Sequence, residues 1–138
     1  YRFPVGEAGA VDVAAGKVLK ELPGHALAVL ALAASDDGKL LVSGSADATV
    51  RGFDPDGGKE RWKWAARKPA CAAAVRKGGG QVAGGLADGG LVVLDVSGPS
   101  PREVSSTGAH TSGTTCAAYS PDGHRLATVG GDGALRVW

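Results

Sequence analysis

Three residue types that serve in nucleophilic catalysis occur close together in the last quarter of the sequence. His110, Ser112 and Asp132 could supply a base, a nucleophile and an orienting carboxylate. The interval of 22 positions from His110 to Asp132 also separates His25 from Asp47. Because the pair is duplicated at the same spacing, the pattern favours a repeated structural role over an active site. We therefore expect no catalytic residues, and we predict that the chain is not an enzyme.

A second group of residues has the chemistry of a binding surface. The segment KERWKWAARK, residues 59–68, carries five cations and two tryptophans in ten positions. Its alternation predicts a strand with both indoles on one face and cations on the other. The cations are then either simply solvated or available to an acidic protein segment or a single-stranded nucleic acid. The candidate partner-binding residues are Arg61, Trp62, Lys63, Trp64, Arg67 and Lys68.

The remaining patterns that could hold a ligand are weak. The run Gly78–Gly80 lacks the G-x-G-x-x-G spacing and precedes a predicted strand, so a turn is favoured over a phosphate cradle. Cys71 and Cys116 form no C-x-x-C pattern, which argues against zinc. Their near-equivalent positions favour two buried free thiols over a disulfide. No metal site and no cofactor are expected.

The duplicated spacing extends beyond the histidine and aspartate. Asp132 is followed 6 positions later by Trp138, and Asp47 is followed 6 positions later by Phe53. The corresponding positions along the chain are Val11, Phe53, Leu94 and Trp138, and the successive intervals between them are 42, 41 and 44 residues. A period slightly above 40 residues, with a Gly-His-like start and a D-G-x-x-R-x-W ending, resembles the WD40 repeat of β-propellers.

The resemblance implies a role for the repeated polar residues. In the family, His, Ser or Thr, Asp and Trp form a buried hydrogen-bond chain within a repeat, the structural tetrad. The positions that correspond in this sequence are His25, Ser43, Asp47 and Phe53, and then His110, Thr128, Asp132 and Trp138. Phenylalanine has no N–H to donate, so the first chain is expected to be one link short.

The resemblance also implies the fold. We expect an all-β chain that forms part of a WD40-type β-propeller, about three and a half four-stranded blades of a larger ring. Residues 1–22 would end one blade, 24–66 and 67–107 would form a repeat and a divergent repeat, and 108–138 would form a repeat without its last strand. We expect the sequence to be part of a longer chain.

The apolar run Ala26–Ala34 is the point where local propensity and the repeat disagree. Alanine and leucine favour a helix, whereas the repeat spacing places an inner strand at about 29–35. Nine residues make only a marginal helix, so a strand is predicted. A continuous apolar run is typical of a strand that is buried on both faces.

Composition adds little about partners. A formal net charge of +1 indicates no strong preference for nucleic acid or membranes, and the longest apolar run is too short to span a bilayer. The resemblance implies an intracellular (cytoplasmic or nuclear) protein-binding scaffold within a larger multiprotein complex. The alternative is a propeller subunit of a ribonucleoprotein that contacts RNA through residues 59–68.

Overall fold

The computed structural model describes residues 8–12, 17–22 and 24–138, and within these ranges the regular structure is entirely β. The prediction of an all-β chain is confirmed. The strands in chain order are β1 (Ala8–Asp12), β2 (Lys17–Leu22), β3 (Val29–Ala34), β4 (Leu41–Ser45), β5 (Thr49–Phe53), β6 (Glu60–Ala65), β7 (Ala70–Val75), β8 (Gln81–Leu86), β9 (Gly90–Asp95), β10 (Arg102–Gly108), β11 (Thr114–Tyr119), β12 (Leu126–Gly130) and β13 (Leu135–Val137). Residues 1–7 and 13–16 of the expected blade end at 1–22 lie outside the described residues.

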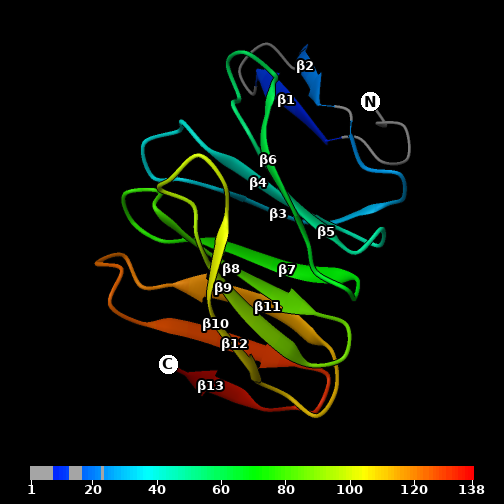
Figure 1. The fold of residues 1–138 in the computed structure, drawn as a ribbon, viewed down its shortest axis with the longest axis vertical. Coiled ribbons are helices and arrows are strands. Elements are labelled where there is room, and N and C mark those ends of the chain that lie inside the picture. Colours follow the sequence, from blue (N-terminus) through cyan, green and yellow to red (C-terminus); the bar gives the residue numbers. More distant parts are fainter. Residues whose placement is uncertain (1–7, 13–16, 23) are drawn as a thin grey trace.

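The strands form antiparallel sheets that follow one another in chain order (Figure 1). Two sheets have four strands, β3–β6 and β7–β10; β11–β13 form a three-stranded sheet and β1–β2 a two-stranded one. Each four-stranded sheet is a meander in which every strand pairs with its sequence neighbour. The first strands of successive sheets lie side by side, with β7 between β3 and β11.

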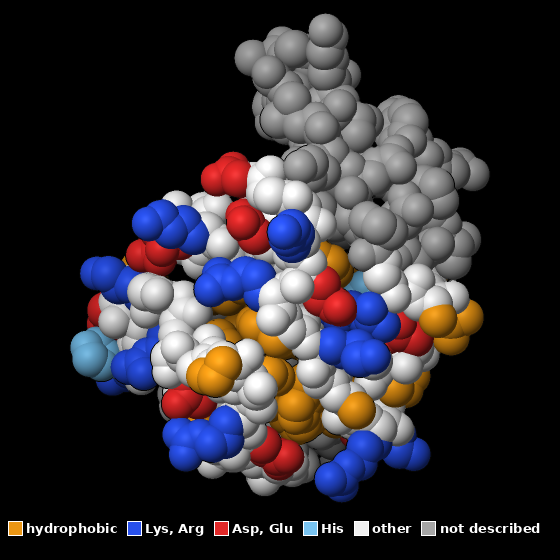
Figure 2. Space-filling view, turned by 45° about the horizontal axis from the view of Figure 1, so that its top comes forward, with side chains coloured by type: hydrophobic (Ala, Val, Ile, Leu, Met, Phe, Trp, Pro, Cys, Tyr) orange, Lys and Arg blue, Asp and Glu red, His pale blue; other side chains and the backbone are white. Residues whose placement is uncertain are grey.

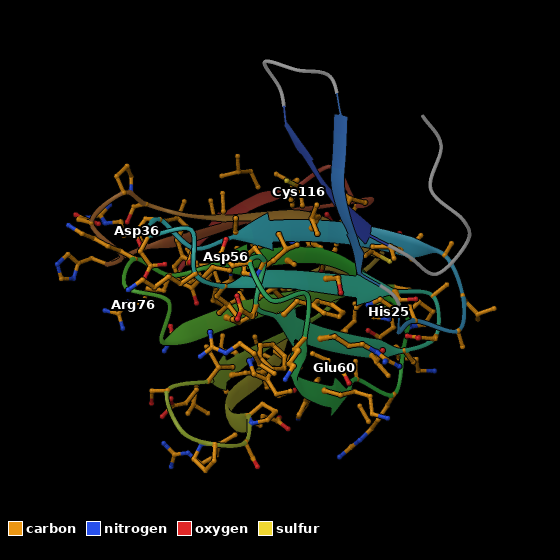
Figure 3. All side chains as sticks on the ribbon, turned by 90° about the horizontal axis from the view of Figure 1, so that it is seen from above. His25, Asp36, Asp56, Glu60, Arg76 and Cys116 are labelled. Atoms are coloured by element: carbon orange, nitrogen blue, oxygen red, sulfur yellow. The ribbon has the colours of Figure 1, made fainter. Side chains whose placement is uncertain are left out.

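The turns between first and second strands are built by a repeated aspartate motif. Asp37 accepts hydrogen bonds from the Ser35 hydroxyl at 2.6 Å and the Lys39 N–H at 2.9 Å, and Gly38 follows at a φ of +72°. Asp122 does the same with Ser120 and His124. These hydrogen bonds lower the pKa of both carboxyls. In Figure 3, Asp36 lies at this end of the sheets and His25 at the opposite end.

The core lies between the sheets. Val50, Val82 and Leu94 are fully buried between β3–β6 and β7–β10. A smaller cluster, which includes Leu91 and Leu126, joins β7–β10 to β11–β13. Stacked sheets buried in this way hold their order through apolar contacts with the next sheet.

The strand prediction for the apolar run is confirmed, but the expected burial on both faces is wrong. Along β3 the exposure alternates, and Leu30 and Leu32 are 47% and 53% exposed. The pleat of a strand turns alternate side chains to opposite faces, so every second residue of β3 points away from the β7–β10 sheet. The run is apolar throughout, yet one of its faces is open.

The cysteines also differ in part from expectation. Both thiols are free, but Cys71 is half-buried and Cys116 is exposed. Burial raises the pKa of the Cys71 thiol. Cys116 is on β11 in the last sheet, and most residues of this strand are not fully buried. The expectation of two buried thiols is therefore wrong for Cys116 and only partly met by Cys71.

Candidate functional site

The residues His110, Thr128, Asp132 and Trp138 meet in one hydrogen-bond chain. His110 Nδ1 lies 3.0 Å from Asp132 Oδ1, and its Nε2 lies 2.9 Å from Thr128 Oγ1. Because a carboxylate only accepts, the Nδ1–H donates to Asp132, and Nε2 shares the second hydrogen bond with the threonine hydroxyl. The Trp138 indole N–H then donates to Thr128 Oγ1 at 3.1 Å.

The carboxylate at the end of this chain also fixes the backbone around it. The N–H groups of Ala134 and Thr111 each donate to Asp132 at 3.0 Å. These two backbone donors, with the His110 ring, hold the pKa of Asp132 well below its usual range. Ser112, the third member of a hypothetical triad, has its hydroxyl oxygen next to Gly131, where an added Cβ would lie 2.8 Å away. No hydrogen bond joins Ser112 to His110 among the described residues.

The first repeat has the same chain without its last link. His25 Nδ1 lies 3.0 Å from Asp47 Oδ2, and His25 Nε2 lies 2.6 Å from Ser43 Oγ. Burial acts to raise the pKa of Asp47, but hydrogen bonds from Thr49, the Ala26 N–H and His25 hold that pKa well below its usual range. Phe53, only 1% exposed, fills the tryptophan position and donates nothing.

The middle repeat has lost this chain. Counting 41 positions on from His25, Ser43, Asp47 and Phe53 gives Ala66, Gly84, Asp88 and Leu94. Ala66, Gly84 and Leu94 are buried, whereas Asp88 is exposed and accepts one hydrogen bond, from the Gly90 N–H at 2.9 Å. Apolar packing replaces the polar network in this sheet.

The basic and tryptophan-rich segment, residues 59–68, divides between two roles. Its indoles face inward: Trp62 is 8% exposed and lies over Gly52, where an added Cβ would be 2.3 Å from the indole, and Trp64 packs against the main core. Arg61 and Lys63 alternate with them and are exposed. The segment therefore presents charge to solvent and aromatic surface to its own fold. Figure 2 shows Lys and Arg side chains distributed around apolar surface on one face of the molecule.

The six candidate binding residues line two recesses rather than one. Arg61, Trp62, Lys63 and Trp64 form one wall of a groove of about 480 Å³, and the loop residues Pro99, Ser100 and Pro101 form the other. We call this the proline groove. Trp64, Arg67 and Lys68 line a second hollow of about 220 Å³. Sequence reasoning missed the loop as part of the site, and its two prolines were the only available signal.

Comparisons with known proteins identify the repeat. The family profile described as WD domain, G-beta repeat matches residues 16–54 and 101–138, more than half of the chain. The chain belongs to the WD40 family. Its predicted membership and its partial β-propeller fold are confirmed. We call the sheets β3–β6, β7–β10 and β11–β13 the first, middle and third blades. The middle blade, whose hydrogen-bond chain is absent, falls largely outside both matched regions.

Two solved structures have a similar fold. The structure of U3-55K superposes with a TM-score of 0.82 at 24% identity, over 93% of this chain and 41% of that chain. The crystal structure of the RRP9 WD40 repeats gives a TM-score of 0.82 at 25% identity, over 93% of this chain and 40% of that chain. This chain therefore spans about two fifths of the length of those chains. No curated protein sequence matches it.

Other groups of functional side chains are few in the described part of the chain. In the ranges that the structure describes, no three His, Cys, Asp or Glu side chains are grouped as a metal site. The same ranges contain no helix that is long and apolar enough to cross a membrane. The surface recesses next to residues 59–68 are thus the strongest candidates for a binding site.

Proposed function

We propose that this chain is part of a non-catalytic WD40 scaffold that binds other proteins within a larger intracellular assembly, and that the proline groove binds an acidic segment of a partner. WD40 propellers typically act as protein-interaction scaffolds. The observation that carries the finer proposal is the arrangement of β6, which presents Arg61 and Lys63 beside a groove whose opposite wall carries two prolines.

An extended acidic peptide suits this groove for two reasons. The exposed guanidinium and ammonium groups supply long-range attraction and charge-assisted hydrogen bonds to carboxylates. Trp64, Pro99 and Pro101 supply apolar surface along the groove. RNA is the weaker candidate, because stacking of successive bases requires several exposed aromatic faces. Trp62 is buried against its own blade, which leaves only the half-buried Trp64 in this segment.

The two open faces of the array support the scaffold part of the proposal. Leu30 and Leu32 are exposed on β3, and Leu135 and Val137 are 66% and 58% exposed on β13. Such apolar sheet faces are suited to pack against further blades, as β3–β6 packs against β7–β10. On this proposal, residues 24–66, 67–107 and 108–138 are successive blades of a larger ring and 1–22 ends another.

The groove is tested by charge reversal at two exposed positions. The variant Arg61→Glu with Lys63→Glu is titrated with a fluorescent poly-glutamate peptide, and Lys77→Glu with Arg125→Glu is the control of equal net charge. We expect at least a tenfold loss for the first variant only, since each charged hydrogen bond contributes about 1.5–3 kcal/mol, with an unchanged melting temperature.

Two outcomes would contradict the proposal. Equal losses in both variants would mean that only net charge attracts the peptide. A single-stranded RNA that binds more tightly than the peptide, with an affinity that falls steeply with salt and depends on Arg61 and Lys63, would favour the ribonucleoprotein alternative.

A further inference from the structure

The first blade holds an arginine between two carboxylates. Arg51 Nη1 lies 3.0 Å from Glu60 Oε1, and its Nη2 lies 3.7 Å from Asp47 Oδ2. The Arg51 side chain is only 12% exposed, so the guanidinium fills space within the blade as well as pairing with both acids. In the third blade Arg136 is the equivalent residue, and its Nη1 lies 3.4 Å from Asp132 Oδ2.

The middle blade keeps both carboxylates and lacks the arginine. Asp88 stands 41 positions after Asp47, and Val92 stands 41 positions after Arg51. The strand register gives the second acid, because Glu103 pairs opposite Leu94 just as Glu60 pairs opposite Phe53. Two anions that flank a cation in the first blade therefore flank a valine here.

The missing side chains leave an open space. The hollow of about 220 Å³ is lined by Ala66 and Val92, which replace the histidine and the arginine, and by Asp88, Glu103 and Trp64. Its volume is several times the roughly 30 Å³ share of one water molecule. Across the described part of the chain, no cation lies within ion-pair distance of Asp88 or Glu103.

We propose that this hollow binds an arginine side chain of a partner protein, which takes the place that Arg51 occupies in the first blade. A guanidinium offers five N–H donors in a planar fork and can pair with two carboxylates at once. Trp64 adds an aromatic surface on which a planar cation can stack. The inference concerns a different recess from the proline groove and does not depend on an acidic partner there.

Arg67 and Lys68 stand at the rim of the same hollow and set a condition on the guest. Their charges oppose a second cation, so the arginine should be flanked by neutral or acidic residues on its own chain. A lone lysine is a poorer guest, because its ammonium is a compact, strongly hydrated point charge that does not match two separated carboxylates.

The experiment uses a probe that carries only the side chain in question. N-acetyl-arginine amide is titrated into the ¹⁵N-labelled protein at low salt, beside the citrulline and lysine analogues. We expect saturable shifts at the Trp64 indole N–H and the Ala66 and Asp88 amides. Affinity for citrulline, which has the same shape without the charge, should be about tenfold lower or worse.

Matched variants assign the site. Glu103→Gln and Asp88→Asn should each weaken binding severalfold, and Glu60→Gln, the equivalent change at an occupied site, should leave it unchanged. Val92→Arg should abolish binding by filling the hollow from within the chain. Because Val92 is 3% exposed and that variant could fail to fold, the exposed Glu103→Gln change is the deciding one.

Three results would overturn the proposal. The first is equal affinity for the citrulline analogue, and the second is unchanged binding in both Glu103→Gln and Asp88→Asn. The third is binding that appears only in Arg67→Ala, because this chain's own Arg67 would then be the occupant of the hollow. The Arg61→Glu, Lys63→Glu protein keeps all the residues of this hollow. Its arginine binding therefore separates a failure here from a failure of the proline groove.

Discussion

One turn position is alanine in the first blade and glycine in the other two, and it offers a direct test of what holds the array together. Ala48, Gly89 and Gly133 occupy it with φ values of 65°, 92° and 78°. Each N–H bonds back across its own turn, to Ser45 O, Leu86 O and Gly130 O respectively. In this left-handed region a residue with a Cβ costs roughly 1–2 kcal/mol, whereas glycine does not.

The expected magnitudes follow from what a side chain meets at each site. Gly133 has open space around an added Cβ, so only the backbone strain opposes Gly133→Ala. The lower entropy of the unfolded variant offsets part of that strain, and the variant should be destabilised by a few tenths to about 1 kcal/mol. Ala48→Gly should stabilise by a similar amount. At Gly89 a Cβ would lie 1.9 Å from the His110 carbonyl oxygen of the next blade, so Gly89→Ala should add about 1–3 kcal/mol or more of overpacking.

The assay is urea denaturation of the three variants, followed by circular dichroism. Since both Ala109 and His110 donate their N–H groups to Gly89 O at 3.0 Å, the Gly89 variant should also uncouple the third blade from the second. It should then show a shallower transition as well as a lower midpoint. Equal effects at Gly89 and Gly133 would refute the reasoning, because they would show that backbone conformation alone matters. A destabilising Ala48→Gly would refute the strain at that turn.

Three further predictions concern the hydrogen-bond chain and the tryptophan contact. The hydrogen bonds that lower the pKa of Asp132 stabilise the fold above about pH 4, and this stabilisation is lost as the pH falls through the folded pKa. Asp132→Asn removes the titrating group, so the free energy of unfolding, measured by urea titration, should fall less steeply between about pH 5 and 2. Trp138→Phe removes the N–H donor to Thr128 and should cost about 1 kcal/mol, measured by calorimetry. Gly52→Ala should displace the Trp62 indole, seen as a red-shifted fluorescence maximum, at a cost of about 1–3 kcal/mol.

Much of the strand pattern could be predicted from the sequence, because turn residues and the repeat spacing constrain it locally. The apolar run became a strand despite its helical propensity, since the sheet register outweighs local preference. Exposure could not be predicted in the same way: whether Leu30 is covered depends on what lies over that face of β3. The proline groove was likewise hidden, because it joins β6 to Pro99 and Pro101, more than 30 positions further along the chain.

The state of the hydrogen-bond chain in the three blades follows from which link each residue supplies. Tryptophan is the terminal donor, so its replacement by Phe53 leaves Ser43 still bonded to His25 at 2.6 Å, and no buried polar group loses its only partner. Histidine is the central link. Its loss alone would leave a buried hydroxyl without its partner, at a cost of about 1–3 kcal/mol.

Replacing the whole chain with apolar residues avoids that cost, because no buried donor or acceptor remains. The middle blade fits this logic, since Ala66, Gly84 and Leu94 are all apolar and only the exposed Asp88 keeps its polar type. Its sheet forms with four strands like that of the first blade. Loss of the polar chain therefore need not weaken the blade, and it leaves the carboxylates of Asp88 and Glu103 beside an open hollow.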